Sequence, residues 1–124
     1  MRNRLRAIAF ALTALFITAA CTPEEIALYL DTTAETRGVL DADDLHRLRM
    51  CESTDNYRAI SSSGLYRGAY QFDQTTWDDV AGRHFPWLSG VDPIDAAPWW
   101  QDAMTRALWS ERGKQPWPIC GRHV

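Results

Sequence analysis

The first twenty residues constrain this chain most, because they decide how much of it is left to fold. Three arginines within the first six residues precede an uncharged run from Ala7 to Ala20. As a helix this run would be about 21 Å long, whereas the hydrocarbon core of a bilayer is about 30 Å thick. A basic start, a short apolar run and small residues at its end are typical of a secretory signal peptide. We therefore expect residues 1–20 to be a signal peptide and the protein to be extracytoplasmic.

Cys21 follows the apolar run directly, after Ala19 and Ala20. This arrangement resembles the lipobox of bacterial lipoproteins, whose cysteine is acylated and becomes the mature N-terminus. Thr18 departs from that pattern, which usually has an aliphatic residue there. Two interpretations remain: lipid attachment at Cys21, or ordinary cleavage after Ala20 and secretion without a lipid. Lipidation is favoured because it also accounts for the odd number of cysteines, three in all.

The chain that remains after export is acidic. The full sequence has 13 basic and 16 acidic residues, and the signal peptide takes three arginines with it, which leaves a net charge of −6. Such a balance gives no electrostatic support for a nucleic-acid partner. Residues 21–42 read as the lipid-anchor cysteine followed by an acidic tether. A short helix with Thr22 as N-cap and Pro23 in its first turn is the alternative for this segment.

Residues 43–124 remain for one domain, expected to be α+β in class but mostly α. The pattern predicts a helix that Asp41 caps and that runs to about Glu52, then turns and a short irregular β-hairpin over 53–71. A second helix is predicted from Asp73 to about Gly82, and a third from Pro98 to Gly113. A domain of about 80 residues buries a small core and often needs a covalent cross-link.

Two cysteines remain once Cys21 is assigned to a lipid. A disulfide between Cys51 and Cys120 would close nearly the whole domain and contribute about 4 kcal/mol in the chain-entropy model. Export makes this oxidation plausible, and two free buried thiols are the alternative. No metal site is expected, because the chain has no Cys-x-x-Cys and its three histidines are scattered.

Glu52 is the residue with the clearest chemical potential. On a helix it follows Leu48 by four positions and Leu45 by seven, so it shares their apolar face. A carboxyl group there loses hydration, which raises its pKa and suits a general acid that protonates a glycosidic oxygen. The alternative is a helix-end glutamate that reaches water or pairs with Arg58, and position alone favours this alternative.

A longer pattern surrounds Glu52 and favours the interpretation of this residue as a general acid. It consists of Leu48–Ser53 (LRMCES), Asn56-Tyr57, Gly64–Phe72 (GLYRGAYQF), Thr76-Trp77 and the C-terminal Trp117–Cys120 (WPIC). Over residues 43–121 the chain resembles the transglycosylase-like domain of actinobacterial resuscitation-promoting factors. The resemblance implies a lysozyme-like fold and cleavage of the β-1,4 bond in peptidoglycan glycan strands. It also implies that Glu52 is the catalytic acid, that Thr76 lies in the substrate groove, and that Cys51 and Cys120 form a disulfide.

The aromatic residues near Glu52 suit a sugar groove, since Trp and Tyr rings stack on the flat faces of pyranoses. The expected substrate-binding residues are Tyr66, Tyr70, Gln71, Thr76 and Trp77. We expect Tyr66 and Tyr70 to be more exposed than Trp100, Trp109 and Trp117, which are assigned mostly to the core. The alternative is that the rings simply fill the interior of a small domain.

A second carboxylate is harder to find, although glycosidases usually use two. Asp55 reads as a turn residue and Asp73 as a helix N-cap. The resemblance implies a route with one glutamate, which acts first as acid and then as base while the C6 hydroxyl of the sugar closes an anhydro ring. No cofactor is needed for this chemistry.

These observations predict a cell-envelope enzyme that cleaves peptidoglycan. The rival function is a catalytically weak glycan-binding or signalling module with the same fold. The expected partner is the glycan strand, with membrane contact only through a lipid on Cys21; no cell-wall endopeptidase or other protein partner can be named.

Overall fold

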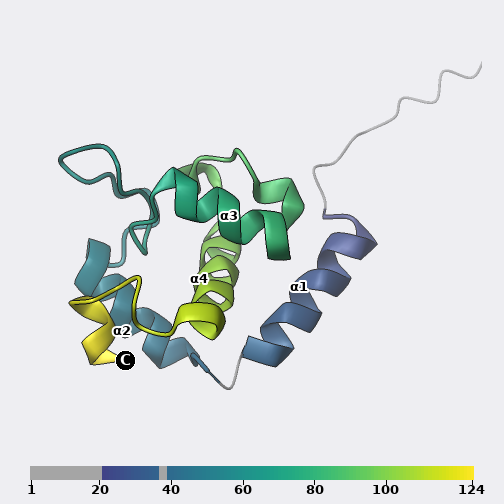
Figure 1. Cartoon of the computed structure of the whole chain (residues 1–124), viewed down its shortest axis with the longest axis horizontal. Helices are drawn as coiled ribbons and strands as arrows, with labels where there is room; N and C mark the ends of the chain where they lie inside the picture. Colours follow the sequence, from purple (N-terminus) through teal and green to yellow (C-terminus); the bar gives the residue numbers. More distant parts are fainter. Residues whose placement is uncertain (1–20, 37–38) are drawn as a thin grey trace, which may run out of the picture.

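Helix α4 (Pro98–Arg112) lies in the middle of the structure, and the other helices surround it (Figure 1). The computed structural model describes residues 21–36 and 39–124, so the predicted signal peptide lies outside the described residues. The other helices are α1 (Pro23–Thr36), α2 (Ala42–Ser53) and α3 (Gln74–His84). The chain also contains three short 3-10 helices: η1 (Pro86–Leu88) and η2 (Pro93–Asp95) between α3 and α4, and η3 (Cys120–His123) after α4. Helices α1 and α3 pack against α4, while η3 packs against α2.

Helix α2 has the boundaries that its sequence predicts. The Asp41 side chain accepts a hydrogen bond from the Asp44 N–H at 2.8 Å, and the Asp44 carboxylate accepts from the Asp41 N–H at 3.1 Å. This reciprocal capping box starts the helix. Leu45 and Leu48 are buried on its inner face. The helix ends at Ser53, so Glu52 lies in its last turn.

Helices α3 and α4 begin at their predicted start signals, and α4 also ends at its predicted stop signal. Asp73 caps α3 through the Thr76 N–H at 2.8 Å, and the Phe72 and Trp77 rings meet edge to face at 5.3 Å. Helix α3 continues two residues beyond Gly82, to His84. Pro98 occupies the first turn of α4, and Gly113 ends that helix with φ +58°. Proline fits a first turn because it needs no N–H partner there.

The predicted β-hairpin is not confirmed by the described residues. The segment between α2 and α3 contains two isolated antiparallel bridges, Ile60 with Arg67 and Arg67 with Phe72, but no strand. Gly64, Gly68 and Gln71 adopt positive φ, so the chain turns too often for a ladder to form. The domain is therefore small and mostly helical, in keeping with a lysozyme-like fold.

The predicted tether contains a helix instead. The Thr22 hydroxyl accepts from the Glu25 N–H at 3.2 Å, and the Glu25 carboxylate accepts from the Thr22 N–H at 2.6 Å. This is the capped-helix alternative for the segment. Helix α1 lies along α4, where the Tyr29 ring meets Trp100 edge to face at 5.2 Å. No helix in the described ranges is both long and apolar enough to cross a membrane.

Cys51 and Cys120 form the disulfide that the cysteine pattern and the resemblance predict. Their Cα atoms are 5.6 Å apart, and 69 positions separate them in sequence. The bridge joins the last turn of α2 to the start of η3, so it closes most of the domain. Cys21 is outside this bridge and is partly buried at the start of α1. Lipidation of Cys21 stays a prediction.

Candidate active site

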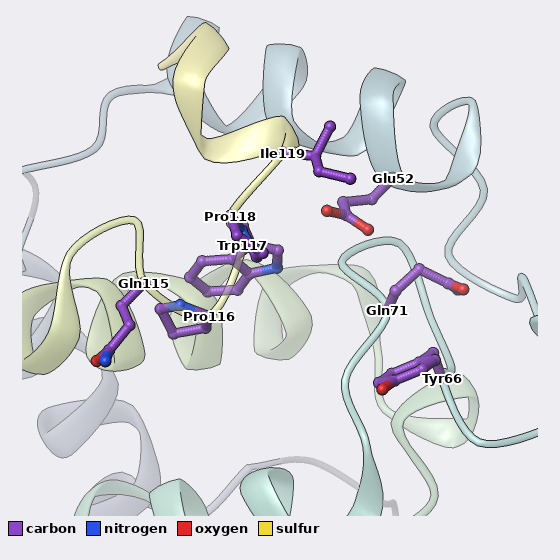
Figure 2. A pocket seen from close by; sticks show the side chains of 8 residues that line it. All are labelled: Glu52, Tyr66, Gln71, Gln115, Pro116, Trp117, Pro118 and Ile119. Atoms are coloured by element: carbon purple, nitrogen blue, oxygen red, sulfur yellow. The ribbon is translucent and has the colours of Figure 1, made fainter.

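A groove lies between the end of α2, the loop that follows it and the C-terminal segment (Figure 2). Its larger hollow has a volume of about 450 Å³ and is lined by Glu52, Tyr66, Gln71, Gln115, Pro116, Trp117, Pro118 and Ile119. A second hollow of about 130 Å³ shares Tyr66, Gln71, Pro116 and Trp117 with the first and reaches Thr76 and Arg112. Because the two hollows share four lining residues, they form one groove that extends from Glu52 to the C-terminal end of α4.

The local fold around α2 positions Glu52 at this groove. The Ser53 hydroxyl, next in sequence, donates to the Ala69 carbonyl oxygen at 2.8 Å. This bond attaches the end of α2 to the loop that carries Gln71. In Figure 2 the Glu52 side chain reaches from α2 into the space between Gln71 and Trp117. The acid is thus held by a helix end that is fixed on two sides, by the disulfide at Cys51 and by Ser53.

Glu52 has the electrostatics of a general acid. Burial raises the pKa of its carboxyl group above the usual value of 4.5. The structure shows no hydrogen bond or ion pair to this carboxylate from any residue it describes. The pairing with Arg58 considered above does not occur, since the Arg58 guanidinium is directed to the Ile94 carbonyl oxygen at 3.4 Å. The acid form of Glu52 is therefore favoured at a higher pH than for an exposed glutamate.

The two nearest carboxylates in sequence have other partners. Asp55 accepts from the Arg49 guanidinium at 2.6 Å. Asp73 accepts from the Thr76 N–H through Oδ1 and from the Thr76 hydroxyl through Oδ2, both at 2.8 Å. Asp73 is the N-cap that the sequence predicts. Glu52 is the one acid lining the larger hollow.

Four of the five predicted substrate-binding residues line the groove: Tyr66, Tyr70, Gln71 and Thr76. Tyr66 is 48% exposed and lines both hollows, as does Gln71. Gln71 adopts a left-handed backbone with φ +54°, and its amide donates to the Gly68 carbonyl oxygen at 3.0 Å. Thr76 lies in the second hollow, with its hydroxyl hydrogen donated to Asp73. Their contact with a substrate stays a prediction.

Tyr70 and Trp77 are buried, so the expectation that Tyr70 is exposed is wrong. The Tyr70 ring is fully covered, and its hydroxyl donates to Asp102 at 2.5 Å. Trp77 is also fully buried and donates its indole N–H to the Leu88 carbonyl oxygen at 2.9 Å. Trp77 therefore supports the groove from behind, whereas Tyr70, although its ring is covered, lies among the residues that line the second hollow. Of the tryptophans assigned to the core, Trp100 and Trp117 are buried and Trp109 is partly buried.

The C-terminal segment forms one wall of the groove, which sequence reasoning did not predict. Residues 115–119 line the larger hollow. The Trp117 indole N–H donates to the Tyr70 carbonyl oxygen at 2.9 Å, so this wall is joined to the opposite loop. The Trp-Pro-Ile-Cys motif is part of the family resemblance and was the one sequence signal for this wall. Its spacing does not indicate which of its side chains face the groove.

Polar side chains behind the groove hold the loop between α2 and α3. Asp102 accepts from the Tyr57 hydroxyl at 2.8 Å and from Tyr70, and the Arg49 guanidinium donates to the Tyr70 oxygen at 2.9 Å. Burial, together with the neighbouring Asp102 carboxylate, raises the pKa of Tyr70 far above its usual value. Within the described ranges, no group of three or more His, Cys, Asp or Glu residues lies close enough to hold a metal ion.

The sequence profile of the transglycosylase-like domain matches residues 39–120. These residues include α2, α3, α4 and all the residues that line the groove. The chain belongs to the transglycosylase-like domain family. The resemblance to the domain of resuscitation-promoting factors is thereby confirmed.

Curated relatives of this transglycosylase-like chain include proteins of mycobacteria and staphylococci. Resuscitation-promoting factor RpfA of Mycobacterium tuberculosis (strain H37Rv) is 31% identical over 97 residues, 78% of this chain and 21% of that protein. Probable transglycosylase SceD of Staphylococcus carnosus is 36% identical over 75 residues, 60% of this chain and 31% of that protein. The chain thus spans less than a third of these relatives. No solved structure gives a significant match.

Proposed function

We propose that this transglycosylase-like chain cleaves the β-1,4 glycosidic bond of peptidoglycan glycan strands, with Glu52 as the general acid. The observation that carries the proposal is the position of Glu52, a partly buried carboxyl group with a raised pKa inside an elongated groove. Membership of the family and the names of the relatives, transglycosylase and resuscitation-promoting factor, support it. The same relatives support an extracytoplasmic location, and the lipobox-like sequence that ends at Cys21 supports a lipid on that cysteine.

The proposed reaction begins with a proton transfer. Protonated Glu52 donates its proton to the bridging oxygen, the C1–O bond breaks, and its electron pair leaves with that oxygen. The Glu52 carboxylate then takes a proton from the C6 hydroxyl of the same sugar, whose oxygen bonds to C1 and closes an anhydro ring. Water in place of that hydroxyl would give the hydrolysed product. One residue serves as acid and base because Asp55 and Asp73 are engaged elsewhere.

The groove supplies the binding surface for this reaction. The exposed Tyr66 ring offers a face for a pyranose, and the Gln71 and Thr76 side chains offer hydrogen-bonding groups along the same groove. Pro116, Trp117 and Ile119 give the opposite side an apolar wall, from which a bound strand would displace water. Partial exclusion of water strengthens the interactions of the acid with the developing charge.

The test is the release of soluble fragments from purified peptidoglycan by the wild-type protein and by Glu52→Gln. Glutamine has nearly the same shape as glutamate but no acidic proton, so we expect release to fall at least a hundredfold. Mass spectrometry of the fragments then distinguishes an anhydro end from a hydrolysed one, because the anhydro end lacks one water. Equal release of fragments by both proteins would refute the proposed enzymatic activity. If both proteins bound glycan equally well but released no fragments, the glycan-binding module would be favoured.

A further inference from the structure

The end of the groove away from Glu52 carries a cationic side chain, in the same hollow as the Asp73 carboxylate. Arg112, the last residue of α4, lines the second hollow together with Thr76. Among the residues that line the two hollows of the described structure, it is the one cation. Its side chain is 43% exposed, so a bound molecule can reach it.

The protein engages only part of the Arg112 guanidinium. In the part of the chain that the structure describes, its side-chain partner is Asp79, whose Oδ2 lies 3.2 Å from Nη2. Asp79 is shared, because its Oδ1 also accepts from Arg83 at 2.5 Å. A guanidinium has five N–H donors in a planar fork, so most of the donors of Arg112 remain available.

The other acids at this end of the groove, including Asp73 in the second hollow itself, accept hydrogen bonds from the protein. Both oxygens of Asp73 accept hydrogen bonds from Thr76. Glu111 is bound by the Arg83 guanidinium at 3.0 and 2.7 Å, and it also contacts His84 at 2.5 Å. The second hollow therefore carries charges of both signs, Arg112 and Asp73, and the unused N–H donors of Arg112 are what it offers to an anion.

We propose that Arg112 forms a carboxylate-binding subsite, which takes a free carboxylate on the peptide side chain of the glycan. The proposal rests on the proposed function and deepens it. The sugars of the glycan are neutral, whereas their peptide side chains carry carboxylates. The planar fork of arginine matches a carboxylate with two parallel hydrogen bonds. Because Glu52 and Arg112 lie in one groove, a strand at the acid extends toward this subsite.

The test measures binding to full-length protein that carries Glu52→Gln, so that no probe is cleaved. The probes are an uncross-linked tetrasaccharide of the glycan with its peptides, the same fragment with its peptide carboxylates amidated, and the fragment without peptides. Adding Arg112→Gln should weaken binding of the first probe about tenfold and leave the other two unchanged. Added salt should weaken the first probe alone. Arg122→Gln, an exposed arginine outside the groove, is the matched control and should change none of the three.

Three results would overturn the subsite. An equal loss on all three probes would make Arg112 a sugar contact or a structural residue. If the protein that retains Arg112 bound the fragment with free carboxylates and the amidated fragment equally well, Arg112 would not recognise the charge. Failure to bind any of the three fragments would also overturn the subsite. Failure of the proposed function would be a separate result. In that case strands without peptides would show no cleavage that depends on Glu52, and this reaction does not need Arg112.

Discussion

Burial removes water from the Glu52 carboxylate, and no described residue supplies a hydrogen-bond donor or a cation in its place. Its raised pKa means that the folded protein holds this proton more tightly than the unfolded chain does. Stability linked to the proton is therefore fully present below the usual pKa of 4.5 and is lost as the pH rises through the raised folded value. At neutral pH the ionised carboxylate destabilises the fold, a common property of catalytic groups.

Glu52→Gln should for this reason be more stable than the wild-type protein at about pH 7 and nearly equal to it at about pH 4. The amide cannot ionise, so its stability does not follow the titration of Glu52. Thermal unfolding of both proteins at the two pH values measures the difference. Glu111→Gln is the opposite control, because the Arg83 guanidinium lowers the pKa of Glu111 and its loss should destabilise the protein at about pH 7. A lower melting temperature of Glu52→Gln at about pH 7 would contradict the argument.

At the scale of elements, the loop between α2 and α3 is held by side chains because it contains no strand. The buried amide of Gln101, on α4, accepts from the Ala69 N–H at 2.9 Å and donates to the Tyr57 and Ala96 carbonyl oxygens at 3.0 and 3.1 Å. The Gln101 amide thus satisfies backbone N–H and C=O groups that strand pairing would satisfy in a hairpin. Gly68 makes the approach of loop and helix close enough for these bonds.

Gly68→Ala should test this attachment. Its Cβ would lie 2.6 Å from Oε1 of Gln101, and its backbone has φ +87°, so both the hydrogen bond and the backbone would be strained. We expect a loss of about 2–4 kcal/mol in the free energy of unfolding. Gly64→Ala is the matched control, because φ is +75° but nothing lies within 4 Å of the new Cβ. It should cost about 1 kcal/mol. Equal losses in urea denaturation would show that the contact with Gln101 does not matter.

At the scale of the whole molecule, the disulfide connects the two walls of the groove. Cys51 precedes Glu52 on α2, and Cys120 follows Ile119 on the C-terminal wall. The bridge therefore reduces the freedom of the unfolded chain and also sets the distance between the acid and the opposite wall. Stability and groove geometry depend on the same covalent link.

Replacing both cysteines, Cys51→Ser with Cys120→Ser, should lower the free energy of unfolding by about 4 kcal/mol, the chain-entropy value for a closed loop of this length. We also expect peptidoglycan cleavage to fall under conditions where circular dichroism still shows a helical domain, because the C-terminal wall is no longer fixed. Cys21→Ser in protein without a lipid should change neither quantity, since Cys21 lies outside the bridge. Full stability of the double variant would contradict the assignment.

Features that depend on residues close together in the chain can be predicted from the amino-acid sequence. Capping side chains, prolines, glycines and apolar spacing predict the limits of α2 and α4 and the start of α3, because each depends on contacts within a few positions. The cysteine pattern predicts the disulfide, and the spacing of Glu52 from Leu45 and Leu48 predicts its apolar setting. These inferences hold because helix geometry is local.

Which side chains face the groove depends on how distant segments pack in the folded chain. Tyr66 and Tyr70 are four residues apart and alike in type, yet one is exposed and the other is buried against Asp102. The wall at residues 115–119, the attachment of the loop to Gln101 and the position of Arg112 all join segments far apart in the sequence. Burial of a ring or an amide depends on what packs over it, and that is a property of the folded chain, which no local spacing contains.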